Sequence, residues 1–546
     1  MIQFKLNLLK HFRLLGLGLI MTVITGTEKS TLFSNVNIYH YPDADAILVK
    51  NGIIQEIGKS NELRADQIID LKSGYLYPGF TDGHMHLLGY GQALENLDLT
   101  GTASKNQILN IISETAAELP PQAWIIGRGW DQNDWTDKSF PDKNDLDTAA
   151  PDNPVILRRI DGHAVWVNSK VLDMGGITSQ TKDPQGGKIY RDKSGIPTGI
   201  LVDNALDLVA GLIPESTRAD KRRRILKAQA KLNSYGLTSI HDAGTSAETI
   251  DILDELQRAD KLTLRINCLL NNNPADYESY LEKGPKIDNS YYQVRGVKLY
   301  LDGALGSRGA ALLEPYSDDP ENLGLILTDS AKVAESVKLF NKHGFQAAIH
   351  CIGDRANRIA LDIFENEGKN SSRNRIEHAQ IVHEQDMGRF SQLGVLPCIQ
   401  ATHCTSDMYW AEDRLGHSRL NEAYPWQSLI EAGSILPGGS DAPVESPSPL
   451  KGIYAALTRQ DAAGWPRGGW QSRDRMSLDQ ALKMVTEWPA FASFEENIKG
   501  KISTGYYADF TVLDQPIDET KPANILTINI KFTVVGGKLV YNSEKE

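Results

Sequence analysis

Two histidines separated by one residue end a short apolar segment near the start of the sequence. His84 and His86 close residues 78–86, which read PGFTDGHMH. Side chains two positions apart on a strand point to the same face, so both imidazoles can reach one metal ion. A His-x-His pair alone is weak evidence, because histidines with structural hydrogen bonds are common. The position of this pair at the end of a predicted strand strengthens the metal-site interpretation.

Four more residues capable of metal-binding or acid–base chemistry lie within or close apolar runs: Lys298, His350, His378 and Asp441. Taken singly, each has a structural interpretation, since the lysine can extend to solvent, the histidines can be core groups, and Asp441 can cap a helix. Six such residues at predicted strand ends together predict one site. Lys298 matters most among the four, because a buried ammonium is costly unless its pKa falls or the amine is modified.

The elements that must position these residues are eight short apolar runs alternating with helical stretches, a pattern typical of parallel βα units. The runs lie at residues 75–86, 237–242, 264–270, 294–302, 346–352, 374–379, 395–400 and 434–441. Eight units predict an α/β fold, a TIM-type (β/α)8 barrel over 75–499, with catalytic side chains at the C-terminal ends of its strands. Residues 102–235 are not needed to build these eight units. We interpret them as a large insertion after strand 1, which forms a lid that covers the barrel mouth.

Both ends of the chain carry alternating, turn-rich patterns typical of antiparallel sheet. Asn51-Gly52 is a hairpin signal near the start, and Gly536-Gly537 marks a turn near the end. We therefore predict that residues 28–74 and 500–546 build one small composite β-sandwich, with the barrel inserted between them.

The first 27 residues have the order of a secretory signal peptide. Basic residues precede the apolar run 14–24, which is too short to span a bilayer, and no acidic residue occurs before Glu28. We expect export to the periplasm or the extracellular space, without stable membrane association after cleavage. An uncleaved anchor, or a cytoplasmic protein with a helical extension, is the alternative.

Composition narrows the range of partners. The formal net charge is −13 and the basic residues are dispersed, which argues against a nucleic-acid partner. The 41% hydrophobic and 23% charged residues describe a soluble globular protein. A small-molecule substrate is the partner expected for the candidate metal site, and a homo-oligomer stays open. The four cysteines lie in or beside predicted barrel strands, and we interpret them as unpaired core thiols rather than disulfides.

With these residues in place, the sequence resembles the amidohydrolase superfamily, and within it the family 3 group of YtcJ-like proteins, which includes N-substituted formamide deformylase. The resemblance covers nearly everything from about residue 31 to residue 541. It adds five motifs to the strand ends: DGH at 161–163, GLTSIHD at 236–242, DGALGSR at 302–308, GDRA at 353–356 and GSDAP at 439–443.

The family pattern implies a site for one or two divalent metal ions, most plausibly zinc. Its six residues are His84, His86, Lys298, His350, His378 and Asp441. In this pattern Lys298 is carboxylated on its amine and bridges two ions. A carbamate would also turn a repelled positive group into an anionic ligand.

A metal-dependent hydrolase follows from these residues. A bound divalent ion lowers the pKa of water towards about 7 and polarises a carbonyl, and Asp441 is predicted to act as general base and then acid. We predict hydrolysis of a non-peptide C–N bond in an N-acyl or N-formyl amine. A cyclic amide or ester hydrolase is the main alternative, and a non-catalytic, metal-binding regulatory relative is a weaker one, because no ligand is lost.

Four further residues are candidates for supporting roles. His163 is predicted to bind substrate or stabilise an oxyanion, with a structural loop histidine as the alternative. Arg308 is a candidate anchor for a polar group or a surface ion pair, and Trp130 a candidate pocket residue or part of a packed lid. His241 is interpreted as a partner of the metal ligands. His403 has no assigned role, although it lies close to the rim.

Overall fold

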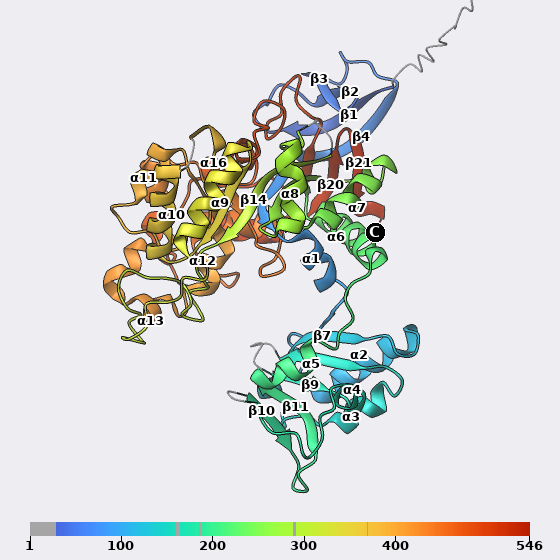
Figure 1. Cartoon of the computed structure of the whole chain (residues 1–546). Helices are drawn as coiled ribbons and strands as arrows, with labels where there is room; N and C mark the ends of the chain where they lie inside the picture. Colours follow the sequence, from blue (N-terminus) through green and yellow to red (C-terminus); the bar gives the residue numbers. More distant parts are fainter. Residues whose placement is uncertain (1–28, 160–163, 185–186, 288–290, 368–369, 546) are drawn as a thin grey trace, which may run out of the picture.

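The computed structural model of the 546-residue chain describes residues 29–159, 164–184, 187–287, 291–367 and 370–545 (Figure 1). Three sheets of eight, seven and six strands organise this part of the chain. The predicted signal segment 1–27 lies outside the described residues. Within them, no helix combines the length and the apolar character needed to cross a membrane.

The eight-stranded sheet is the predicted barrel, and all its neighbouring strands pair in parallel. In spatial order its strands are β5 (Phe80–Met85), β12 (Leu237–Thr245), β13 (Arg265–Asn271), β14 (Tyr292–Tyr300), β15 (Gln346–Cys351), β16 (Arg375–His378), β17 (Leu396–Gln400) and β18 (Gly438–Gly439). The backbone N–H of Asp441 donates to the carbonyl oxygen of His84 at 2.7 Å, which joins the chain after β18 to the end of β5. The TIM-type barrel is therefore confirmed, nearly closed by its shortest strand.

Helices cover the outside of the barrel (Figure 1). They are α1 (Leu87–Ala93), α6 (Arg218–Ser234), α7 (Ala247–Arg258), α8 (Pro274–Lys283), α9 (Ser330–Lys342), α10 (Asp354–Glu367), α11 (Met387–Leu393), α12 (Ala401–Asp407), α13 (Ala411–Leu415), α14 (Trp426–Glu431), α15 (Pro449–Thr458), α16 (Leu478–Met484) and α17 (Glu487–Ala492). The α7 helix begins at a capping serine, because the Ser246 side chain accepts a hydrogen bond from the Thr249 N–H at 3.2 Å. Apolar residues at helical spacing in α7, such as Ile250 and Leu253, are buried in the shared core.

The two chain ends meet in one seven-stranded sheet, which is the composite domain predicted from their turn signals. In spatial order the strands are β21 (Lys538–Asn542), β20 (Ile530–Val535), β19 (Phe510–Leu513), β4 (Gln67–Pro78), β1 (Ser30–Ile38), β2 (Ala46–Lys50) and β3 (Ile53–Gly58). Strand β4 runs parallel to β1 on one edge and antiparallel to β19 on the other. Side chains from both ends, such as Phe33 and Phe510, share one apolar core. The two chain ends therefore combine as predicted, but in one seven-stranded sheet instead of the predicted sandwich of two sheets.

A six-stranded sheet follows α1 and forms the insertion, set apart from the barrel in Figure 1. Its elements are β6 (Leu97–Asp98), α2 (Lys105–Glu118), β7 (Ile125–Trp130), α3 (Lys143–Ala149), β8 (Val155–Arg159), β9 (Ala164–Val167), α4 (Ser169–Met174), β10 (Gly187–Arg191), β11 (Pro197–Asp203) and α5 (Asp207–Ala210). Alternate residues of β8 enter two separate cores, with Val155 and Leu157 in one and Ile156 in the other. The insertion is shorter than the predicted range 102–235, because α6 packs against α1 and leads directly into β12.

Candidate metal centre

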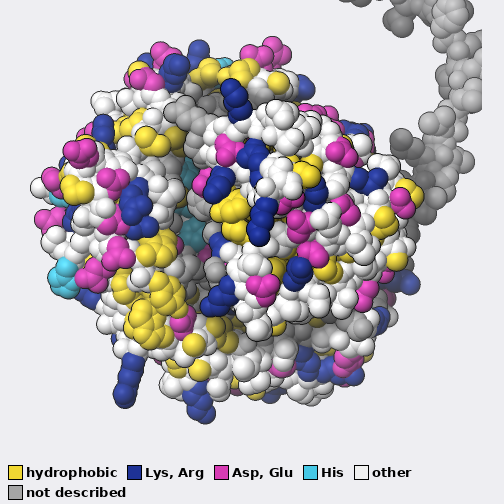
Figure 2. Space-filling view, turned by 90° about the horizontal axis from the view of Figure 1, so that it is seen from below, with side chains coloured by type: hydrophobic (Ala, Val, Ile, Leu, Met, Phe, Trp, Pro, Cys, Tyr) yellow, Lys and Arg dark blue, Asp and Glu magenta, His cyan; other side chains and the backbone are white. Residues whose placement is uncertain are grey.

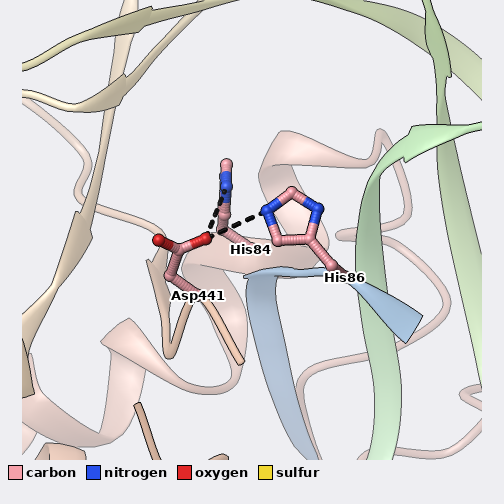
Figure 3. A group of neighbouring side chains, drawn as sticks. All are labelled: His84, His86 and Asp441. Carbon is pink, nitrogen blue, oxygen red and sulfur yellow. Dashed lines mark ion pairs between the residues drawn. The ribbon is translucent and has the colours of Figure 1, made fainter. Parts of the chain in front are cut away.

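The His-x-His pair closes β5, and both of its rings face Asp441 (Figure 3). The Nδ1 of His84 contacts the Glu377 carboxylate, and the Nδ1 of His86 donates to the carbonyl oxygen of Ala243 at 2.7 Å. The two Nε2 atoms lie 3.4 Å and 3.1 Å from Asp441 Oδ1. Because each Nδ1 has an acceptor partner, each Nε2 is left to point its lone pair into the site.

Asp441 lies two residues beyond the end of β18 and belongs to two groups of candidate ligands. One group is His84, His86 and Asp441, and the other is His378, His403 and Asp441; in each, the ligand atoms lie within 4.8 Å of one another. Burial alone would raise the pKa of the Asp441 carboxyl, but the adjacent His84 and His86 outweigh burial and hold it well below its ordinary value. The carboxylate is therefore ionised at neutral pH and available as a ligand or a base.

His378 and His350 come from the neighbouring strands β16 and β15. The Nδ1 of His378 donates to Gln400 Oε1 at 2.8 Å, and its ring lies 4.5 Å from that of His350 and 5.0 Å from that of His84, between centroids. Burial, reinforced by the charge of Lys298, lowers the pKa of His350 to about 3. His350 is thus neutral, the state in which an imidazole binds a metal.

Lys298 lies on β14 with 1% of its surface exposed. Burial lowers the pKa of its ammonium group, while Glu377 and Asp441 oppose the shift. The structure therefore brings all six sequence-predicted ligands to the C-terminal ends of the barrel strands or just beyond them, where TIM-barrel sites form.

A buried ion pair supports the site and was not recognised from sequence. Arg375 and Glu377 are both fully buried on β16, and Arg375 Nε donates to Glu377 Oε1 at 2.7 Å. Arg375 Nη1 also donates to Nδ1 of His241 at 2.8 Å, so His241 supports the ion pair rather than a ligand. The one sequence signal is the order Arg-x-Glu-His, but side chains of adjacent strand residues normally point to opposite faces. A φ of +80° at His378 breaks this alternation, so Glu377 and His378 both reach His84.

The structure gives a different result for each of three supporting candidates, His163, Arg308 and Trp130. His163 lies outside the described residues. Arg308 Nη2 pairs with Asp318 Oδ2 at 2.8 Å, so the ion-pair alternative is present, and its predicted contact with substrate stays a prediction. Trp130 is fully buried in the insertion, where its indole N–H donates to the carbonyl oxygen of Leu157 at 2.8 Å. Full burial leaves Trp130 no surface for a substrate, so the structure places it in the packed core instead.

The residues present fit a divalent metal ion. The Nε2 atoms of His84 and His350 are buried and have no hydrogen-bond partner within the described residues. Imidazole nitrogens combined with one carboxylate are a ligand set suited to zinc, and unpartnered buried nitrogens are costly without a ligand. Figure 2 shows histidine side chains at the floor of a deep groove, so solvent and small molecules can reach this end of the barrel.

Comparison with known proteins agrees with this geometry. The model described as the amidohydrolase family matches residues 67–541. The chain belongs to the amidohydrolase family. This confirms the resemblance found in the sequence, and it accounts for the clustering of histidines, lysine and aspartate at one end of the barrel.

Named relatives of this amidohydrolase cover nearly all of its length. YtcJ of Bacillus subtilis (strain 168) is 33% identical, over 91% of this chain and 96% of its own. N-substituted formamide deformylase of Arthrobacter pascens is 27% identical, over 91% of this chain and 95% of its own. Among solved structures, an uncharacterized metal-dependent hydrolase of Pyrococcus horikoshii OT3 superposes with a TM-score of 0.74 at 27% identity, covering 89% of this chain and 98% of its own.

Proposed function

We propose that this amidohydrolase hydrolyses a non-peptide C–N bond, in a small N-acyl or N-formyl amine. The observation that carries the proposal is the Asp441 carboxylate, which stands among the ring nitrogens of two ligand groups at the C-terminal rim of the barrel. The relative named N-substituted formamide deformylase supports the choice of an amide with a small acyl group.

We propose zinc as the metal, held by the four strand-end histidines, by Lys298 and by Asp441. When bound, a divalent ion supplies Lewis-acid chemistry, because it lowers the pKa of water and polarises a carbonyl. Lys298 is proposed to be carboxylated. Burial lowers the pKa of its amine and so increases the neutral fraction, and the neutral amine adds to CO2, forming an N–C bond and releasing one proton.

Asp441 performs the proton transfers. Because its carboxylate stays ionised, it can accept a proton from the attacking water as the oxygen–carbon bond forms. The same carboxyl group then returns the proton to the leaving nitrogen as the C–N bond breaks, which yields a carboxylic acid and an amine. The Nδ1 hydrogen bonds of His86 and His378 hold their rings in fixed orientation throughout.

Metal analysis combined with amine release tests the proposal. The purified full chain, supplied with zinc and bicarbonate, is assayed against N-formyl and N-acyl amines, with cyclic amides and esters as comparison substrates. We expect near-stoichiometric metal and release of free amine, with turnover abolished in Asp441→Asn and retained in the control Asp260→Asn, which alters an exposed ion pair with Lys538. Preferred hydrolysis of the cyclic amides or esters, or a metal-free protein without turnover, would contradict it.

A further inference from the structure

His403 faces the candidate metal centre from a helix instead of a strand. It lies in the first turn of α12, directly after β17, and 11% of its side chain is exposed. Its Nε2 is 3.9 Å from Asp441 Oδ2, and its ring is nearly parallel to that of His378, at 14° with centroids 6.0 Å apart. The position alone would suit either a metal ligand or a group that contacts substrate.

The partners of Nδ1 distinguish ligands from donors among these histidines. His84, His86 and His378 place Nδ1 against a carboxylate, a backbone carbonyl and an amide oxygen, all of which are acceptors. A neutral imidazole that donates from Nδ1 keeps a lone pair on Nε2. These three rings are therefore in the form that binds a metal through Nε2.

His403 has the opposite arrangement. Its Nδ1 lies 3.1 Å from Nε2 of the Gln380 side chain, an amide N–H donor. A neutral ring that accepts at Nδ1 carries its hydrogen on Nε2. This Nε2 is buried and has no partner among the described residues, so in this tautomer an N–H donor points unsatisfied into the site. Such a group costs stability unless a ligand accepts its hydrogen bond.

We propose that the Nε2–H of His403 donates a hydrogen bond to the carbonyl oxygen of the substrate and to the oxyanion that replaces it. As water adds to the carbon, the π electrons of the C=O bond move to this oxygen, and the donor stabilises the charge that develops there. His403 is then a further catalytic residue, and Gln380 is a positioning residue that sets its tautomer. This inference rests on the proposed function, because it assigns a role at the same site.

The placement of His403 beside the base fits this role. Asp441 Oδ2 lies 3.9 Å from its Nε2, which is beyond a direct hydrogen bond but close enough for both groups to contact one reacting carbonyl. The base can then remove the proton from water on the side of the carbonyl where attack occurs, while His403 contacts the oxygen. His163, for which the family resemblance suggested an oxyanion role, lies outside the described residues.

Substitutions separate a donor from a ligand. His403→Phe keeps a ring and removes the donor, whereas His403→Gln restores an amide N–H; His378→Phe is the matched control at a predicted ligand. We expect His403→Phe to retain wild-type metal content and to lose about 10²–10³-fold in kcat with little change in KM. We expect His403→Gln to recover part of this loss and His378→Phe to lose metal. Metal loss in His403→Phe equal to that in His378→Phe, or unchanged kcat, would overturn the proposal.

A second measurement does not depend on turnover. 15N NMR of the metal-loaded protein with labelled histidine, assigned by the signal missing in His403→Phe, reports which ring nitrogen of His403 carries hydrogen. We expect hydrogen on Nε2, and a shift of tautomer population in Gln380→Leu. Hydrogen on Nδ1 alone would refute the inference whatever the activity. If no N-acyl amine is hydrolysed but Nε2 is protonated, the proposed substrate class fails while the donor assignment holds.

Discussion

Glu377→Gln tests whether the buried ion pair maintains the metal centre. The carboxylate is fully buried and receives hydrogen bonds from Arg375 Nε at 2.7 Å and Nη2 at 3.1 Å. Its second oxygen also contacts Nδ1 of His84. The substitution keeps the shape of the side chain, removes its charge and leaves Arg375 as an uncompensated buried cation.

The expected magnitude follows from the contacts that remain. Removing one partner of a buried ion pair costs about 3–5 kcal/mol. Arg375 keeps two other acceptors, the carbonyl oxygen of Gly83 at 2.7 Å and Nδ1 of His241 at 2.8 Å, so we expect a loss near the lower value, about 3 kcal/mol. Because His84 also loses the carboxylate that orients its ring, we expect metal affinity to fall by about 10–100-fold.

Two assays measure these effects separately. Urea denaturation of metal-stripped protein, followed by tryptophan fluorescence, gives the change in stability, and chelator competition gives the metal affinity. Glu496→Gln is the matched control, because Glu496 pairs with Arg373 through two similar hydrogen bonds, at 2.7 Å and 3.0 Å, in a partly exposed position. We expect that control to lose no more than about 1 kcal/mol and to bind metal normally. Equal destabilisation by both substitutions, or normal metal affinity in Glu377→Gln, would refute the reasoning.

Three further predictions concern packing and thiols. Gly439→Ala would place its Cβ 2.7 Å from the His84 carbonyl oxygen, so we expect lower metal content and a stability loss of about 1–3 kcal/mol. The control Gly211→Ala meets no neighbour within 4 Å and should change neither quantity. Equal behaviour of the two variants in metal analysis and thermal denaturation would contradict this prediction. Trp130→Phe removes the indole hydrogen bond to Leu157 and should cost about 1–3 kcal/mol with KM unchanged; a raised KM would return Trp130 to the substrate site. Burial raises the pKa of all four cysteine thiols, that of Cys404 to about 12. A thiol reagent at pH 8 should therefore label no cysteine in the native protein and all four in denaturant. Labelling of fewer than four cysteines in denaturant without reductant would reveal a disulfide.

The strand-end positions of the predicted ligands were accessible from sequence because the barrel follows a local rule. A βα unit places the residue that closes each apolar run at the C-terminal rim, so His84, His86, Lys298, His350 and His378 could be placed without knowing any long-range contact. The four cysteines followed from the same reasoning, and all are free and buried. The composite sheet followed from turn signals at both ends of the chain.

The rest depends on contacts that no local pattern encodes. Strand β18 is only two residues long although the apolar run covered 434–441. Its Gly439 packs directly against the backbone of His84, where no side chain fits, and this contact between distant parts of the chain is not visible in the local pattern. Glu377 was not predicted from sequence, because the alternation of side chains along a strand fails at the next residue, His378, which has a positive φ. His403 reaches the site because α12 begins directly after β17, which brings the first turn of the helix beside Asp441.

The composite sheet sets the order in which this chain can fold. Strand β4 needs β19 as its neighbour, and the N–H of Phe80 just beyond it donates to Thr511 Oγ1 across 431 residues of sequence. At a synthesis rate of roughly 5–20 residues per second, the edge of β4 emerges from the ribosome roughly 20–90 s before its partner. An unpaired strand edge of this kind invites pairing with other chains. The composite sheet can therefore be completed only after the whole barrel has been synthesised, and a chain that stops short of β19 leaves that edge open permanently.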